Sequence, residues 1–560
     1  MRITAAILLF TISTISTASW GSTLIHNVRG HTMNDGQRID FVALEYADGR
    51  VARIYRDDSE LASSTAQVRV DGGGASLLPG LIDVHGHVAG LGLALASVDL
   101  VGTTSEAHAI ARVAGRLQSE AGSDARSGWL LGRGWNQVLW PGGQFPSRQT
   151  LDRLSKDRPV ALGRIDGHAL WVNSRALALA GIDAQTADPA GGQIVRDSRG
   201  TPTGVLIDNA MGLVAAVMPA STLRSKREAL ARAMDYLVSL GMTSAHDAGV
   251  SAVELAAYDG LLADGDFPLR IYAMLDVLDA ANDAALAAGP RIDEQGLLAV
   301  QSVKISADGA LGSRGAALYA DYSDDPGNSG LLLLSDEELN HHMQRAAAAG
   351  FQVNVHAIGD LANGKVLDEF TRLNEDPKVR SLRHRIEHAQ ILRPQDIERF
   401  AALDVIASVQ PTHATSDKNM AGDRLGEARL EGAYAWRSLL ESGARMAGGS
   451  DFPVEPADPF FGLHAAITRQ DREGVPPGGW RAEEALSREQ AMALFTEDAA
   501  YAAHAEKRIG RLLPGYAADF ILVRDDIFTV DAAKLWENQV LATVVAGKVV
   551  YADAQSPLTK

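Results

Sequence analysis

Apolar runs alternate with segments of helical periodicity through most of this chain. Each run has the length of a buried strand, about four to eight residues, and strands that alternate with helices are typical of a parallel sheet. The pattern predicts strands at 81–87, 242–249, 269–275, 303–309, 351–357, 385–389, 405–411 and 445–451. Eight is the number of parallel strands that closes a (β/α)8 barrel. We therefore predict an α/β fold, a (β/α)8 TIM-like barrel within residues 79–504.

Two of the predicted helices carry their own start signals. Ser335 is followed three residues later by Glu338, and Ser487 by Gln490, which is the spacing of a capping box. Gly350 stands where the first of these helices needs a left-handed residue to end. The residues after Gly350 form one of the predicted strands, so helix and strand follow one another as a barrel requires.

Both ends of the chain have a different pattern of apolar and polar residues. The stretch STLIHNVRGHTMNDGQRIDFVALEYADGRVARIY alternates apolar and polar residues and breaks at Asn34-Asp35-Gly36 and Asp48-Gly49, as short antiparallel strands do. A similar texture returns near the other end in GRLLPGYAADFILV and VLATVVAGKVVYADA. We predict that residues 19–78 and 505–560 fold together as one small β domain.

A long segment separates the first and second predicted barrel strands. Residues 92–235 are too many for a single connecting helix, and they contain strand-like pieces of their own, WLLGRGW and PVALGRI. We therefore predict an inserted subdomain over 92–235.

The first residues have the three parts of a secretory signal peptide. Met1-Arg2 supplies positive charge, ITAAILLFTI an apolar core, and Ser16 and Ala18 small residues at the positions that precede a cleavage site. We predict a signal peptide over 1–18 and export to the periplasm or beyond the cell. The alternative is an N-terminal anchor that is kept, although this apolar core is too short to span a bilayer.

Composition narrows the choice of partners and of metal ligands. The 560 residues are 46% hydrophobic and 22% charged, with a net charge of −18, which argues against nucleic acid and anionic membrane surfaces as partners. No apolar run of membrane-spanning length follows residue 20, so we expect no stable membrane insertion. The chain has no cysteine, so a metal must be held by His, Asp, Glu or a modified Lys. A homodimer is left open.

Polar groups recur at the ends of six of the eight predicted strands. The run GLIDVHGHVAG ends in two histidines one residue apart, and side chains at i and i+2 of a strand share a face. The set is His85, His87, His246, Lys304, His356, His388 and Asp451. Because the C-terminal ends of barrel strands meet at one face, these side chains are expected to converge there, although we do not expect His246 to be a ligand.

Four histidines and one carboxylate are the ligand types of a divalent transition ion. We expect one or two ions per chain, with Zn as the first expectation, and a metal-bound water that becomes hydroxide near neutral pH. Asp451 can bind the metal, or accept a proton from that water and return it to a leaving amine. An aspartate that only caps the following helix is the alternative, but Pro453 stands too close to favour it.

Lys304 needs a separate interpretation. An ammonium group has no lone pair for a metal, but a buried lysine of lowered pKa can react with carbon dioxide to form a carbamate, whose oxygens can bridge two ions. The alternative is an ordinary salt bridge from Lys304 to Asp308 or Asp451.

A set of motifs in this chain resembles the amidohydrolase superfamily, in particular the subgroup with a long insertion after the first strand, to which N-substituted formamide deformylases belong. The motifs are LLPGLIDVHGHVAGLG, GRGWNQVLWPGGQFPSRQTLD, RIDGHALWVNSRAL, TSAHDAGV, VKISADGALGSRGAAL, NVHAIGD, RIEHAQ and GGSDFPVEPADPFFGLHAAITR. The resemblance implies a composite β-sandwich from both ends. It also implies metal ligation by His85, His87, His356, His388 and Asp451, with Lys304 at the position of a carboxylated bridging lysine.

Within the insertion, DGHALWVN resembles a stretch that faces the barrel opening in this subgroup. It supplies the candidate substrate residues His168, Trp171 and Asn173, to which we add Trp135 as a wall of an apolar pocket. A buried structural histidine and ordinarily packed tryptophans are the alternatives. Arg314, Arg429 and Arg469 are candidates for binding a substrate carboxylate.

The hypothesis for function is a metal-dependent amidohydrolase. A metal-activated hydroxide attacks an amide-type C–N bond of a small molecule and Asp451 acts as the proton shuttle. The first alternative keeps the site and changes the bond, to deamination of a ring or hydrolysis of a cyclic amide. The second is a periplasmic binding protein that keeps the barrel without turnover.

Overall fold

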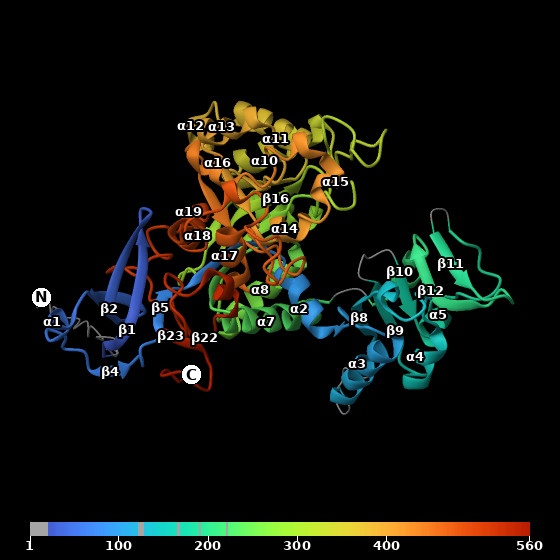
Figure 1. Ribbon diagram of the computed structural model, residues 1–560, viewed down its shortest axis with the longest axis horizontal. Coiled ribbons are helices and arrows are strands. Elements are labelled where there is room, and N and C mark those ends of the chain that lie inside the picture. Colours follow the sequence, from blue (N-terminus) through green and yellow to red (C-terminus); the bar gives the residue numbers. More distant parts are fainter. Residues whose placement is uncertain (1–20, 121–127, 165–168, 190–191, 220–221, 560) are drawn as a thin grey trace, which may run out of the picture.

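The computed structural model describes residues 21–120, 128–164, 169–189, 192–219 and 222–559. The predicted signal peptide, residues 1–18, lies outside the described residues. Three parts follow one another along the longest axis of the molecule (Figure 1). A sheet from both ends of the chain lies on one side, the barrel in the middle and the segment around β7–β12 on the other side.

Eight parallel strands form the central sheet in the part of the chain that the structure describes. They run in the spatial order β6-β13-β14-β16-β17-β18-β19-β20, and the short β15 pairs with β16 outside this path. The strands are β6 (Leu81–Gly86), β13 (Met242–Val250), β14 (Arg270–Asp276), β15 (Arg291–Ile292), β16 (Leu298–Ser306), β17 (Gln352–Ala357), β18 (Arg385–His388), β19 (Ile406–Val409) and β20 (Met446–Gly448).

The sheet nearly closes between its first and last strands. Gly86 forms a parallel bridge with Phe452, and the backbone N–H of Asp451 donates to His85 O at 2.7 Å. The predicted α/β TIM-like barrel is therefore confirmed. The last strand is shorter than predicted, ending at Gly448, and β16 begins five residues before the predicted 303.

Helices cover the outside of the barrel (Figure 1). They are α2 (Val88–Ala96), α7 (Leu223–Ser239), α8 (Ala252–Asp264), α9 (Asp283–Ala288), α10 (Asp336–Ala348), α11 (Asp360–Leu373), α12 (Pro377–Arg380), α13 (Pro394–Leu403), α14 (Pro411–Asp417), α15 (Ala421–Leu425), α16 (Trp436–Glu441), α17 (Pro459–Thr468), α18 (Arg488–Leu494) and α19 (Glu497–Ala502). Both predicted capping boxes are present, at α10 and α18. Gly350 follows α10 with φ of 85°, the left-handed conformation that its position requires.

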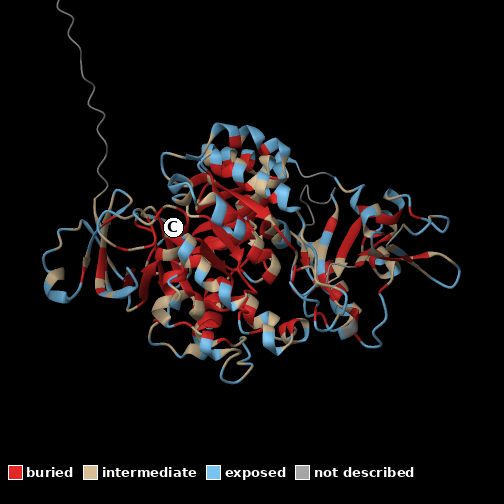
Figure 2. Cartoon of the chain, turned by 90° about the horizontal axis from the view of Figure 1, so that it is seen from above, coloured by how far each residue is buried: buried red, intermediate tan, exposed pale blue. Residues whose placement is uncertain are grey.

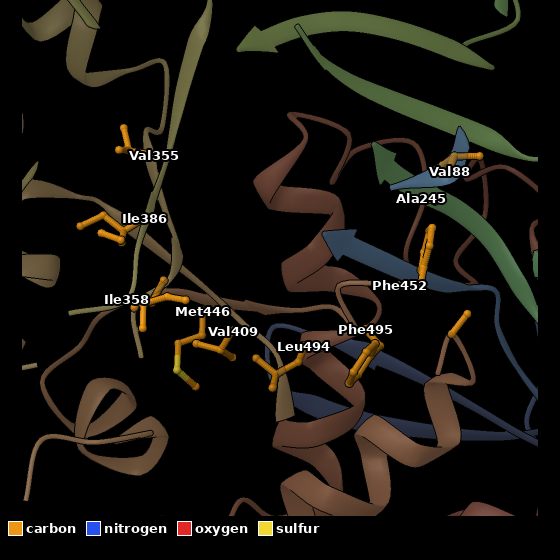
Figure 3. Close-up of a cluster of buried hydrophobic side chains, with 14 of the residues drawn as sticks. Val88, Ala245, Val355, Ile358, Ile386, Val409, Met446, Phe452, Leu494 and Phe495 are labelled. Carbon is orange, nitrogen blue, oxygen red and sulfur yellow. The ribbon is translucent and has the colours of Figure 1, made fainter. Parts of the chain in front are cut away.

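Apolar side chains of the strands pack against those helices. Val355, Ile386, Val409 and Met446 come from four different strands, and Figure 3 shows them in one cluster with Leu494 of α18. Buried residues accordingly concentrate in the middle of the molecule (Figure 2). This packing fixes the ends of the strands, and with them the side chains that those ends carry.

Strands from both ends of the chain share a second sheet, in the order β23-β22-β21-β5-β1-β2-β3, with β4 pairing β1. Its strands are β1 (Thr23–Asn34), β2 (Gln37–Ala47), β3 (Arg50–Tyr55), β4 (Val68–Asp71), β5 (Ser76–Pro79), β21 (Phe520–Val523), β22 (Val540–Val545) and β23 (Lys548–Ala552), and the short α1 (Asp58–Leu61) follows β3. The two halves of the chain meet where β5 pairs antiparallel with β21.

A third sheet lies between β6 and β13 in the sequence, with the order β11-β12-β10-β9-β8-β7. Its elements are β7 (Val98–Asp99), α3 (Glu106–Ser119), β8 (Leu130–Trp135), α4 (Arg148–Leu154), β9 (Val160–Arg164), β10 (Ala169–Val172), α5 (Ser174–Leu179), β11 (Gly192–Arg196), β12 (Pro202–Asp208) and α6 (Met211–Ala215). Over the described residues, no helix is both long enough and apolar enough to cross a membrane.

Candidate metal centre

Three of the predicted ligands form a compact buried group at the C-terminal end of the barrel. His85 comes from the end of β6, His388 from the end of β18, and Asp451 from the residues just after β20. One nitrogen of each imidazole and one carboxylate oxygen all lie within 4.8 Å of one another. Donor atoms at such separations can share one cation.

The other three predicted ligands adjoin this group. His87 Nε2 lies 3.3 Å from Asp451 Oδ1, and Lys304 Nζ lies 3.3 Å from His85 Nε2. The ring of His356 lies against that of His388, with centroids 4.5 Å apart. The structure therefore brings all six residues into one connected cluster, although they span more than three hundred positions of the sequence.

The backbone bends sharply where two of these side chains project. His388 has φ of 77° and Asp451 has φ of 62°, so both are non-glycine residues in the left-handed region. Such residues cost about 1–3 kcal/mol each and cluster at functional sites. Asp451 is held in this conformation by its backbone hydrogen bond to His85 O.

Each of three imidazoles forms a hydrogen bond through one ring nitrogen. The other ring nitrogen is then available to bind a metal. His85 Nδ1 lies 2.5 Å from Glu387 Oε2, and His388 Nδ1 lies 2.7 Å from Gln410 Oε1. His87 Nδ1 donates to Ala248 O at 2.9 Å. A carboxylate or carbonyl that holds Nδ1–H sets the tautomer and turns the Nε2 lone pair toward the metal.

Glu387 is itself held by a buried counter-charge. Arg385 Nε lies 2.8 Å from Glu387 Oε1, both side chains are fully buried, and Arg385 Nη2 also donates to Glu387 Oε2 at 2.9 Å. Ser408 Oγ donates to the same Oε2 at 2.6 Å. Burial alone opposes ionisation of Glu387, but Arg385 and His85 outweigh it and hold its pKa well below the usual range.

Burial and neighbouring charges leave the three donors in the protonation states that a metal needs. Burial lowers the pKa of His85 to about 4, and burial together with the neighbouring His356 takes the pKa of His388 well below 6.5. Burial opposes ionisation of Asp451, but His87 and His85 hold its pKa at about 2. Neutral imidazoles and an ionised carboxylate at neutral pH fit a divalent cation.

Lys304 is buried beside this group. Its Nζ faces His85 Nε2, and among the described residues no carboxylate lies within ion-pair distance of it, so neither of the two salt bridges considered for it is formed. Burial is the main cause that lowers its pKa. His356 Nε2 lies 3.4 Å from Asp308 Oδ1 and is buried without a hydrogen-bond partner among the described residues.

We expect metal affinity to fall on acidification in a way that depends on His87. Burial lowers the pKa of this imidazole, but Asp451 outweighs burial and raises it above 6.5. A cation bound by His87 must displace that proton, so affinity falls as pH drops through the His87 pKa, by about tenfold per pH unit. Zn²⁺ titrations from pH 8 to pH 5 should show this slope in the wild type and a shallower one in His87→Gln. Equal slopes would exclude His87 as a ligand.

Several functional neighbours were not predicted from the sequence. Arg385 and Glu387 stand at i and i+2 of a strand predicted to be buried, and opposite charges on the inner face of such a strand were an available signal. His246, which we did not expect to be a ligand, accepts a hydrogen bond at Nδ1 from Arg385 Nη1 at 3.0 Å. His413 follows β19 and lies beside Asp451.

Two of the predicted substrate residues belong to the core of the inserted segment. Trp135 and Trp171 are both fully buried and pack edge-to-face, with ring centroids 6.3 Å apart. The indole N–H of Trp135 donates to Leu162 O and that of Trp171 to Ser147 O. Their role as pocket walls is therefore corrected to core packing.

Asn173 is likewise structural. It is fully buried, its side-chain oxygen accepts from the backbone N–H of Ala176 as the N-cap of α5, and its amide donates to Ser155 O and Arg158 O. All of its hydrogen-bonding capacity is used within the segment, so it has none for a substrate. His168 lies outside the described residues.

The candidate arginines are also occupied elsewhere. Arg314 pairs with Asp324 at 2.9 Å, and Arg429 donates to Ala320 O and Asp321 O. Arg469 is fully buried, with its guanidinium 4.0 Å from the ring centroid of Trp436. These contacts hold loops together, and a carboxylate-binding role is not needed to explain them.

The family model described as the amidohydrolase family matches residues 69–551, which includes the barrel and every residue of the cluster. The chain belongs to the amidohydrolase family. Curated relatives agree over nearly the full length. A Bacillus subtilis protein named as an amidohydrolase, YtcJ, is 34% identical over 93% of this chain and 97% of its own.

Two further amidohydrolase-family comparisons bear on the site. N-substituted formamide deformylase of Arthrobacter pascens is 25% identical over 91% of this chain and 94% of its own. A crystal structure described as an uncharacterized metal-dependent hydrolase from Pyrococcus horikoshii superimposes with a TM-score of 0.75 at 28% identity, and it covers 91% of this chain and 99% of that one. By family and fold the chain is a hydrolase of the amidohydrolase superfamily, and its buried His/Asp group can hold a metal ion.

Proposed function

We propose that this protein is an exported amidohydrolase that hydrolyses an amide-type C–N bond of a small molecule with a divalent metal, Zn²⁺ first among them. The observation that carries the proposal is the buried group of His85, His388 and Asp451, whose donor atoms lie within 4.8 Å of one another. The printed name of the Arthrobacter relative, a formamide deformylase, supports the choice of an amide bond.

When bound, the cation supplies an activated water and polarises the substrate carbonyl. Asp451 is ionised at neutral pH and close enough to its histidines to sit beside that water, so it accepts the proton as the C–O bond forms. It then returns the proton to the nitrogen as the C–N bond breaks. Amide and water give carboxylic acid and amine.

Lys304 completes the proposal. Its buried amine has no carboxylate partner among the described residues, so the neutral form can add to carbon dioxide, forming an N–C bond and releasing one proton to give a carbamate. The anionic oxygens of that group would add donors beside the metal site that His85, His388 and Asp451 would form.

The domain division and the location of the protein are part of the same proposal. Residues 19–78 and 505–560 form a β-sandwich domain, 79–504 the hydrolase barrel and 92–235 its insertion. The pairing of β5 with β21 and the separate sheet β7–β12 support this division. The N-terminal sequence of Met1 to Ala18 supports export to the periplasm or beyond.

A substrate panel tests the function. Zn²⁺-loaded protein is incubated with N-substituted formamides, acetamides and cyclic amides, and products are separated by mass spectrometry. We expect a carboxylic acid and an amine from at least one open-chain amide, and none after chelation of the metal. Ammonia release from a ring, or turnover of cyclic amides alone, would favour the alternative reactions, and no turnover across the panel would favour a binding protein.

A further inference from the structure

His413 lies beside the candidate metal centre and falls in none of the motifs quoted above. It belongs to α14, which follows β19 directly, so it stands at the C-terminal end of the barrel. Its ring lies nearly parallel to that of His388, at 21° with centroids 5.8 Å apart. Its Nε2 lies 3.6 Å from Asp451 Oδ2.

The Nε2 atom of His413 is buried and has no hydrogen-bond partner within the part of the chain that the structure describes. At 3.6 Å, Asp451 Oδ2 is beyond hydrogen-bond distance, and a buried polar atom without a partner costs about 1–3 kcal/mol. His464 on the neighbouring helix α17 has partners for both ring nitrogens, because Nδ1 contacts Ala532 O at 2.9 Å and Nε2 contacts Asp471 O at 3.2 Å. The Nε2 atom of His413 makes no such contact with the fold among the described residues.

The two oxygens of Asp451 face different partners. Oδ1 lies 3.3 Å from His87 Nε2 and 3.8 Å from His85 Nε2, on the side of the metal ligands. Oδ2 faces His413. A substrate group that lies beside both Oδ2 and His413 Nε2, which are 3.6 Å apart, therefore contacts a proton acceptor and an imidazole nitrogen.

We propose that His413 binds the substrate, with its Nε2–H donating a hydrogen bond to the carbonyl oxygen of the amide beside Asp451. This rests on the proposed function. The donor stabilises the negative charge that grows on that oxygen as water adds to the carbonyl carbon, and it acts strongly because the site is buried. In this arrangement Asp451 transfers the proton, and His413 donates a hydrogen bond to the carbonyl oxygen.

The test compares His413→Leu, which removes the donor, with His413→Gln, whose amide N–H reaches about as far as Nε2. His341→Gln is the matched control, because His341 is exposed on α10. All variants are prepared with Zn²⁺. We then measure metal content, the thermal midpoint, and kcat and KM on the best amide of the panel. Calorimetry measures the binding of acetohydroxamate.

We expect His413→Leu to lose about 100-fold in kcat/KM, as removal of one such donor does elsewhere, and about tenfold in acetohydroxamate affinity. Metal content should not change, the thermal midpoint should not fall, and His413→Gln should recover most of both losses. Wild-type kcat/KM in His413→Leu, loss of metal from it, or no recovery in His413→Gln would each overturn the inference. If the wild type cleaves no amide, the proposed function fails, and the acetohydroxamate comparison still decides the role of His413.

Discussion

Asp451→Asn is expected to lower kcat by about a thousandfold while the barrel stays folded. An asparagine fills the same volume but cannot accept the proton from water, and proton transfer by a positioned side chain is worth about 10²- to 10⁴-fold. The backbone N–H that closes the barrel at His85 O is unaffected by the change. The loss should therefore fall on turnover rather than on folding.

The measurement is kcat on the best amide of the panel, with circular dichroism and thermal unfolding of the same samples. Asp423→Asn is the matched control, because Asp423 is exposed on α15 at the same end of the barrel and the change in charge is identical. Wild-type kcat in Asp451→Asn would remove Asp451 from proton transfer. An unfolded variant would show that the carboxylate holds the fold.

Arg385→Met is expected to destabilise the barrel by about 3–5 kcal/mol, because it leaves the carboxylate of Glu387 buried without its counter-charge. The double variant Arg385→Met/Glu387→Met removes both charges and should be more stable than the single variant. The arginine is also lost as a donor to Val84 O and Ser408 Oγ, which adds to the effect in both variants.

Differential scanning calorimetry gives the order of the melting temperatures. We expect the wild type to melt at the highest temperature, the double variant at a lower one and Arg385→Met at the lowest. The exposed control Arg53→Met should melt close to the wild type. A double variant less stable than Arg385→Met would show that Glu387 contributes by something other than charge pairing. The double variant should also bind Zn²⁺ about 10- to 100-fold more weakly, because it removes Glu387, the carboxylate that orients His85.

The fold was predictable because strand length, helix periodicity and capping signals are local. Each predicted barrel strand overlaps an observed one, and the helix from Ser335 begins and ends where its caps require. The strand ends were less predictable. The predicted strand 405–411 stops at Val409, because α14 begins at Pro411 and a proline favours the first position of a helix.

The convergence of the six candidate ligands was also predictable, since barrel topology sends every strand end to one face, whatever the distance in sequence. The residues that orient the ligands were not. Glu387 on β18 meets His85 on β6, and nothing near either residue in the sequence indicates that pairing. The position of His413 beside Asp451 depends in the same way on how α14 packs.

The candidate substrate residues of the insertion were assigned a binding role that their contacts in the structure do not indicate. DGHALWVN contains residue types that suit a binding site, but Trp171 serves the core of the segment and Asn173 its helix cap. Capping by asparagine is common, and the sequence N-S-R-A could have been interpreted as a helix start. Resemblance of a motif to a site-facing stretch does not decide which way its side chains point.

The metal content of the purified protein tests the central claim most directly. After loading with Zn²⁺ and removal of free metal by gel filtration, elemental analysis should find at least one ion per chain in the wild type and far less in His388→Ala/Asp451→Ala. A folded wild-type protein that retains no more metal than the double variant would contradict the account.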